Sequence, residues 1–253
     1  MGTLLQSVSD RGVATITFNR PDRANSYDSA MLDALCAGFE QYGGDPKVRV
    51  IVLRGAGKHF SAGAAIGEGA AKPRLSMGEV CALIDAVPKP TLAVVQGACI
   101  GGALAIASCC DMIIADREAT FSIPEVRLGF APGPLIGTFV RAMGYRAVRR
   151  YLLSGERFSA EEALRIGLVG TVCETGALDR KCEAWIDQCL LGAPGAIARA
   201  KQLLQRNAMP PALSGEQIHE LQTAFEAVSS SDEAAEGRAS FKEKRKPKWY
   251  PSK

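Results

Sequence analysis

The sequence predicts an α/β protein whose first half alternates strands with helices and whose second half is mostly helical. Stretches with the apolar patterns of strands recur between amphipathic segments from residue 13 to residue 116. Their spacing is that of strand–helix–strand units with largely parallel pairing. From Pro132 onward the periodic segments are helical, and Gly and Pro separate them. The 253 residues, 47% of them hydrophobic, are enough to bury a large core.

Four strands are expected in the first half. Residues 13–18 alternate apolar side chains with two threonines, the pattern of a half-buried strand. Residues 48–55 are almost continuously apolar, which indicates a strand that is covered on both faces. Two further apolar stretches, residues 91–97 and 112–116, complete the set.

Helices are expected between these strands and after them. Asp28 is a suitable N-cap for a helix over residues 29–42, because its carboxylate can accept from the first free amides. Further helices are expected over residues 76–86 and in the stretch 97–111. The second half should contain helices over residues 135–143, 147–153, 160–166, 178–190, 195–207, 216–229 and 232–244. We divide the chain into an α/β core of residues 1–190 and a helical C-terminal region of residues 191–253.

Composition and short motifs exclude several classes of protein. A net charge of +3 is too small to indicate nucleic-acid binding. The eight cysteines have no C-x-x-C spacing, and two histidines are too few for an ordinary zinc site. No secretory leader opens the chain, and no apolar run is long enough to cross a membrane. We expect a cytoplasmic protein with reduced thiols and no metal, nucleic-acid or membrane partner.

Two loops of small residues are the candidate functional features. Each follows an apolar strand and leads toward a helix: "HFSAGAAIGEG" at residues 59–69 and "GACIGGALAIA" at residues 97–107. Small side chains let a ligand approach the backbone, and two free amides can converge on one oxygen that gains negative charge. The alternative explanation is tight packing of helices against strands. No G-x-S-x-G elbow and no G-x-x-x-x-G-K-[ST] phosphate loop is present.

Six segments in order resemble the enoyl-CoA hydratase/isomerase (crotonase) family over nearly the whole chain. They are "ITFNRPDRANSYDSAM", "FSAGAAI", "VVQGACIGGALAIASCCDMIIA", "ATFSIPEVRLGFAPG", "SGERFSAEEALRIGLV" and "EGRASFKEKRKPKWY". The resemblance implies a crotonase-like spiral of strand–strand–helix units, followed by a helical C-terminal trimerisation region. The expected assembly is a homotrimer or a dimer of trimers.

The resemblance also implies the catalytic groups. The backbone amides of Ala62 and Gly102 would hold the thioester oxygen of an acyl-CoA, and Glu125 would be the acid/base. The family's other glutamate is replaced by Ala105, and its usual aspartate after "AGA" by Ala65. In an apolar pocket the Glu125 carboxylate would be tuned toward proton transfer near neutral pH.

One glutamate leaves several reactions open. We favour a lyase, a 2-enoyl-CoA hydratase, because several segments are similar to methylglutaconyl-type hydratases. The alternative is an isomerase that converts 3-enoyl-CoA to 2-enoyl-CoA, with Glu125 moving the proton. Decarboxylation or thioester hydrolysis on the same oxyanion hole is a further family chemistry. A non-catalytic CoA-binding protein is the third possibility, motivated by Ala65 and Ala105.

By the same resemblance, coenzyme A is carried by the substrate and no separate cofactor is expected. The residues implied to contact it are Arg23, Ala24, Ala64, Ile66, Phe241 and Lys244. Phe241 and Lys244 belong to a basic C-terminal segment, which charge alone would explain as a solvated helix face. Tyr27, Ile66 and Phe130 are expected to line the acyl pocket, and His59 to be a partly exposed loop residue.

Overall fold

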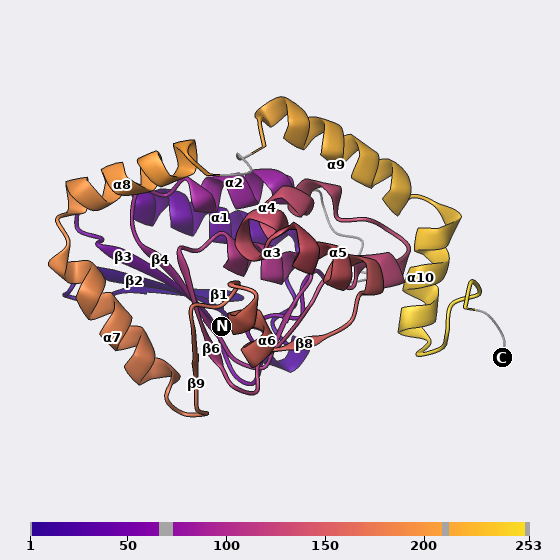
Figure 1. Cartoon of the computed structure of the whole chain (residues 1–253), viewed down its shortest axis with the longest axis horizontal. Helices are drawn as coiled ribbons and strands as arrows, with labels where there is room; N and C mark the ends of the chain where they lie inside the picture. Colours follow the sequence, from indigo (N-terminus) through magenta and orange to yellow (C-terminus); the bar gives the residue numbers. More distant parts are fainter. Residues whose placement is uncertain (1, 66–72, 209–212, 251–253) are drawn as a thin grey trace.

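The computed structural model describes residues 2–65, 73–208 and 213–250, and its strands form two sheets (Figure 1). The larger sheet has six strands in the order β1-β2-β3-β4-β6-β9, and the smaller has three in the order β5-β7-β8. The strands are β1 Leu4–Val8, β2 Val13–Phe18, β3 Val50–Gly55, β4 Thr91–Val95, β5 Ala98–Ile100, β6 Met112–Asp116, β7 Thr120–Ser122, β8 Phe158–Ser159 and β9 Thr171–Cys173.

Parallel pairing dominates the larger sheet, as the sequence predicts. Only β1 runs antiparallel, to β2, and the other four pairings are parallel. In β2 the alternate residues Ala14, Ile16 and Phe18 are fully buried, and the threonines between them are half-buried. The half-buried pattern therefore identifies this strand correctly.

Helices cover both faces of the sheet. They are α1 Ser29–Gly44, α2 Met77–Asp85, α3 Gly102–Ser108, α4 Gly133–Met143, α5 Tyr145–Ser154, α6 Ala160–Arg165, α7 Leu178–Leu191, α8 Pro194–Arg206, α9 Gly215–Ser229 and α10 Asp232–Lys242, with short 3₁₀ turns η1 Pro21–Arg23 and η2 Glu125–Leu128. Asp28 caps α1 as predicted, because its side chain accepts from the Met31 amide at 2.9 Å.

Two apolar clusters lie on opposite faces of the sheet. The main core contains Leu53 of β3, Ala93 of β4 and residues of α1 to α4. The smaller cluster joins Val52 and Leu92 on the other face to Cys182 and Ile186 of α7. Coverage on both faces explains why β3 has an apolar sequence without alternation.

The stretch 97–111 differs from the single helix that the sequence predicts. Residues 98–100 form β5, which pairs with β7, and the helix α3 begins only at Gly102. Gly101 lies between them with a φ of +57°, a conformation that glycine adopts without strain. The strands β5, β7, β8 and β9 were not predicted, because segments of two or three residues give too short a pattern. The strand β1 was missed because most of its residues are exposed, so its sequence lacks a buried face.

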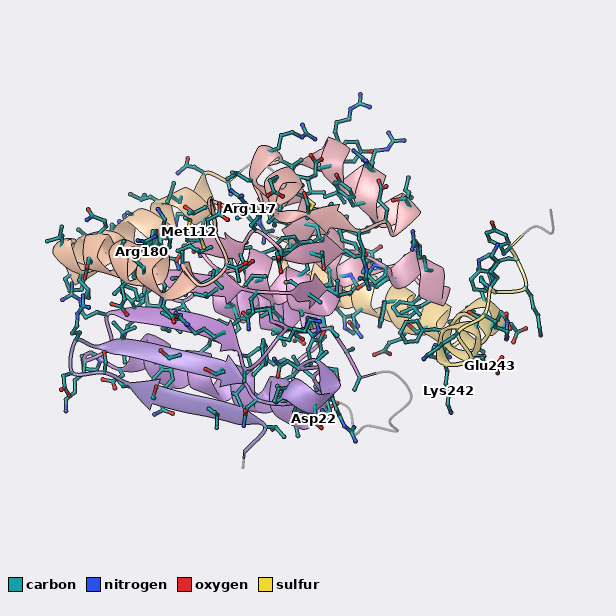
Figure 2. The ribbon with its side chains drawn as sticks, turned by 90° about the horizontal axis from the view of Figure 1, so that it is seen from below. Asp22, Met112, Arg117, Arg180, Lys242 and Glu243 are labelled. Carbon is teal, nitrogen blue, oxygen red and sulfur yellow. The ribbon has the colours of Figure 1, made fainter. Side chains whose placement is uncertain are left out.

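The helical second half is placed in two separate parts of the molecule. The α7 and α8 helices lie at one end, and α9 and α10 lie toward the other (Figure 1). Figure 2 shows the same separation in side chains, with Arg180 of α7 far from Lys242 and Glu243 at the end of α10. The α9 helix packs on α2 and α4, and α10 packs on η2. The trimerisation role predicted for this region stays a prediction.

A close backbone approach fixes α10 against η2. A Cβ on Gly237 would overlap the Leu128 carbonyl, and one on Gly129 would overlap the Glu233 carbonyl. We expect Gly237→Ala to push α10 away and to lower the free energy of unfolding by about 1–3 kcal/mol, measured by urea denaturation. Gly195→Ala in α8 is the control, because no atom lies within 4 Å of its added Cβ. Equal losses in both variants would contradict this account.

Candidate active site

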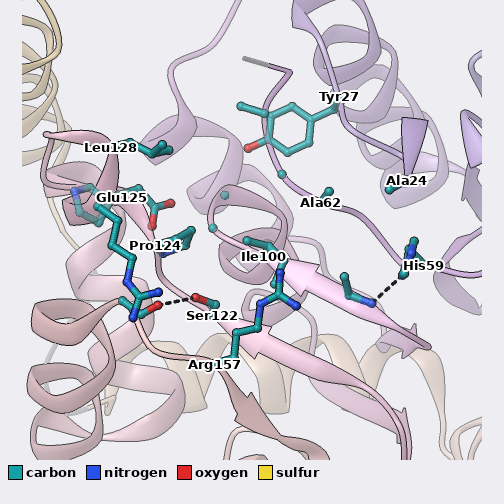
Figure 3. Close-up of a pocket in the computed structure, with 18 of the residues that line it drawn as sticks. Ala24, Tyr27, His59, Ala62, Ile100, Ser122, Pro124, Glu125, Leu128 and Arg157 are labelled. Atoms are coloured by element: carbon teal, nitrogen blue, oxygen red, sulfur yellow. Dashed lines mark hydrogen bonds between the residues drawn. The ribbon is translucent and has the colours of Figure 1, made fainter. Parts of the chain in front are cut away.

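One large cavity of about 1210 Å³ lies between the loops of the first half and the C-terminal helices (Figure 3). Its wall includes residues 62–64 of the loop after β3, the glycine pair Gly101 and Gly102, and Glu125. The C-terminal part contributes Gln222, Phe225, Ser240, Phe241, Arg245 and Pro247. A cavity of this size is large enough for an acyl thioester with part of its carrier.

Glu125 is a buried acidic residue in the wall of this cavity. It begins η2 directly after Pro124 and is 7% exposed. A Cβ on Gly101 would stand 2.7 Å from its Oε1, so this glycine makes room for the carboxylate. Its Oε2 is buried and has no hydrogen-bond partner among the described residues. Burial raises the pKa of Glu125 to about 7, although the hydrogen bond from its own backbone amide opposes that change.

The two glycines at the start of α3 differ in how their amides are used. The Gly101 N–H donates to the Ser122 carbonyl at 2.9 Å and joins this turn to β7. Gly102 is the first residue of α3, so its N–H has no acceptor one turn earlier in the helix. In the part of the chain that the structure describes, no other hydrogen bond engages this N–H. It is available to a ligand in the cavity.

The amide of Ala62, the second predicted donor, is arranged differently from that of Gly102. The Ala62 N–H donates to the Ala24 carbonyl at 2.9 Å, so it is already engaged. Ala64 differs, because the hydrogen bonds of its pairing with Tyr27 are made by the residues on either side of it. The Tyr27 N–H donates to the Gly63 carbonyl, and the Ala65 N–H donates to the Tyr27 carbonyl. In this parallel pairing the Ala64 N–H points away from Tyr27. Ala64 lines the cavity, and its N–H has no acceptor among the described residues.

The remaining predicted site residues fall into three groups. Ala24, Ala64 and Phe241 line the cavity, as do the predicted acyl-pocket residues Tyr27 and Phe130. Arg23 and Lys244 are not among the described residues that line it, whereas Arg245 of the same basic segment is. Ile66 lies outside the described residues. Contact of any of these residues with coenzyme A, and the absence of a separate cofactor, stay predictions.

Asn25 and His59 hold the loops of the cavity wall together. The fully buried Asn25 amide donates to the Ala56 and His59 carbonyls, and its oxygen accepts from the Arg20 N–H. The His59 Nδ1 accepts from the Ala98 N–H at 3.1 Å, which links the first loop to β5. Sequence reasoning missed both positioning roles. The second Asn of the "NRPDRAN" turn, Asn25, was the available signal for the first, since Asn tolerates the φ of +54° found here.

The described residues contain no group of three or more metal-ligating side chains. None of their helices has the length and apolar character needed to cross a membrane. The seven buried cysteines and the half-buried Cys189 are all free thiols.

Comparison with known proteins agrees with this geometry. A family model described as enoyl-CoA hydratase/isomerase matches residues 9–252. A crystal structure of an enoyl-CoA hydratase from Mycobacterium avium subsp. paratuberculosis K-10 is 29% identical, with a TM-score of 0.87 over 99% of this chain and 100% of that one. Another, from Shewanella pealeana ATCC 700345, is 30% identical, with a TM-score of 0.76 over 98% and 96%.

A methylmalonyl-CoA decarboxylase structure is also similar, at 27% identity and a TM-score of 0.84 over 99% of each chain. The chain belongs to the enoyl-CoA hydratase/isomerase family, and it has the crotonase fold that the sequence predicts. The family acts on acyl-CoA thioesters. Since relatives of similar likeness include a decarboxylase, the fold alone does not select one reaction.

The raised pKa of Glu125 has a consequence for stability. The unfolded chain ionises this group near its ordinary value of 4.5, whereas the folded protein retains the proton up to about pH 7. Folding is therefore disfavoured progressively as the pH rises through this window. We expect the free energy of unfolding of Glu125→Gln to rise relative to that of wild type, by up to about 3 kcal/mol between pH 4.5 and pH 8. Urea denaturation across this pH range measures the gain.

The control is Glu220→Gln on the exposed surface of α9. It should follow wild type at every pH. A constant difference between Glu125→Gln and wild type would show that the carboxyl ionises equally in the folded and unfolded chain.

Proposed function

We propose that the chain is a 2-enoyl-CoA hydratase that works with a single carboxylate, Glu125. The observation that carries the proposal is this buried carboxylate, which faces the cavity beside Gly101 and titrates near neutral pH. A group with a pKa close to the working pH can both accept and donate a proton. Its unpartnered Oε2 leaves one oxygen for a water or a substrate C–H.

We assign the oxyanion hole to the amides of Ala64 and Gly102. Both N–H groups lie at the cavity wall and lack protein acceptors among the described residues. They come from separate loops, one after β3 and one at the start of α3, which the Ser61 pairing with Cys99 holds side by side. Two such donors would stabilise the enolate oxygen of the thioester, at about 3 kcal/mol for each donor.

The hydration step then follows from these groups. Glu125 takes a proton from water as the water oxygen bonds to C3 of the enoyl thioester. The electron pair of the double bond moves toward the thioester oxygen, where Ala64 and Gly102 donate hydrogen bonds. The proton held by Glu125 passes to C2 and restores the carbonyl, so the product contains the whole water molecule.

Isomerisation of 3-enoyl-CoA is the second candidate, and the lack of a second acid favours it. Ala105 is fully buried on α3. In the family pattern that this chain resembles, a glutamate stands at this position. Glu125 would take a proton from C2 and return it to C4, while the double bond moves to C2–C3. The proton and electron count balances without water. The segments similar to methylglutaconyl-type hydratases leave hydration as the preferred reaction.

Removal of the carboxylate tests the role of Glu125. We expect Glu125→Gln to lower kcat on the best enoyl-CoA substrate about 10²–10⁴-fold, because proton transfer is lost. Binding of the CoA thioester, measured by calorimetry, should be unchanged. Glu118→Gln is the matched control, since Glu118 also lines the cavity but is exposed. Full turnover by Glu125→Gln would refute the assignment.

The same assay in heavy water separates the two reactions by mass. A product heavier by one water molecule supports hydration. A shifted double bond without added water supports isomerisation. Binding without turnover of 2-enoyl and 3-enoyl thioesters of several chain lengths would leave only a CoA-binding role.

Replacement of single backbone amides tests the oxyanion hole. Lactic acid incorporated at position 64 replaces the N–H with an ester oxygen, and we expect kcat to fall about 10²-fold. The same exchange at position 62 removes the bond to Ala24, so it should cost about 1 kcal/mol of stability and leave kcat close to wild type. The reverse pattern would restore the assignment of Ala62.

A further inference from the structure

Tyr27 is joined through its backbone to the loop after β3 that carries Ala64. Its N–H donates to the Gly63 carbonyl at 3.0 Å, and its carbonyl accepts from the Ala65 N–H at 2.9 Å. The side chain is 4% exposed and lines the cavity. The residue therefore moves with the loop that carries the Ala64 amide, and its ring has a fixed position over the site.

The hydroxyl of this ring reaches the glycine pair at the start of α3. A Cβ on Gly102 would overlap Tyr27 Oη, just as a Cβ on Gly101 would crowd Oε1 of Glu125. The two adjacent glycines thus leave room for two oxygens, one from Glu125 and one from Tyr27. Figure 3 shows the Tyr27 hydroxyl directed toward the side of the cavity where Glu125 lies.

Among the described residues, the hydrogen of this hydroxyl lacks a strong acceptor. Its recorded partner is the Met77 sulfur at 3.8 Å, which is a weak acceptor. Burial, and secondarily the charge of Glu125, raise the pKa of Tyr27 well above its ordinary value. The phenol therefore stays protonated and can serve only as a neutral hydrogen-bond donor or acceptor, not as a base.

We propose that the Tyr27 hydroxyl is a third donor to the oxygen that the Gly102 and Ala64 amides bind. This inference rests on the proposed acyl-CoA function, and it assigns the residue a catalytic contact. Positions 102 and 105 lie three residues apart, on one face of α3. Tyr27 accordingly supplies a polar group on the face where Ala105 carries none.

Tyr27→Phe removes the hydroxyl and keeps the ring. The probe is acetoacetyl-CoA, whose enolate has its own ultraviolet band, so charge stabilisation is read without turnover. Wild type should shift the bound ligand toward the enolate. Tyr27→Phe should reduce the enolate-to-keto ratio about 10-fold or more and lower kcat by a similar factor, with little change in KM. Tyr42→Phe is the matched control, because this tyrosine is buried in α1 away from the described cavity wall.

Each outcome has one meaning. If Tyr27→Phe keeps the wild-type enolate ratio and kcat, the proposal is overturned and the hydroxyl only packs against Met77. If Tyr27→Phe binds acetoacetyl-CoA with a higher Kd but an unchanged enolate-to-keto ratio, the proposal is overturned as well. If wild type itself does not form the enolate, the oxyanion hole and the proposed function fail together with this inference. A loss of enolate in Tyr27→Phe alone, with unchanged folding by circular dichroism, supports the third donor.

Discussion

The burial of one carboxylate is the constraint on which the site depends. Ionising Glu125 in these apolar surroundings costs free energy. The fold keeps this side chain buried because the segments packed around it are held in place. Gly101 makes room for one oxygen, and α10 packs backbone to backbone against the turn η2 that carries the residue. The helical second half is thus part of the geometry of the candidate site, since an element distant in sequence holds the carboxylate in place.

The cavity wall shows the same dependence on distant segments. The loop after β3 is tied to β5 through the His59 imidazole and to the turn after β2 through the Asn25 amide. Phe130 and Phe225 meet edge to face at a centroid distance of 5.6 Å, so α9 closes the other side. These contacts hold backbone amides in fixed orientations, which is what stabilisation of a developing charge requires.

The sequence predicts the elements with a clear pattern and misses those whose form depends on partners. Alternation identified β2, and the acidic side chain of Asp28 identified the cap of α1. Glu125 was predicted from the family resemblance alone, and its role stays a prediction. The three residues of β5 are extended only because β7 lies beside them. The choice between Ala62 and Ala64 was equally hidden. Pairing with Ala24 and Tyr27 decides which amide faces the cavity, and an alanine side chain carries no sign of it.

On the function proposed above, a single carboxylate would also fix the stereochemistry of hydration or isomerisation. Glu125 lies on one side of the cavity, beside Gly101, so its proton reaches and leaves the acyl chain from one face. In hydration, the new C–O and C–H bonds then form on the same face of the double bond. In isomerisation, the hydrogen that leaves C2 and the one that arrives at C4 share that face. In heavy water, the configuration of the deuterium-labelled carbon would therefore report the side from which Glu125 acts.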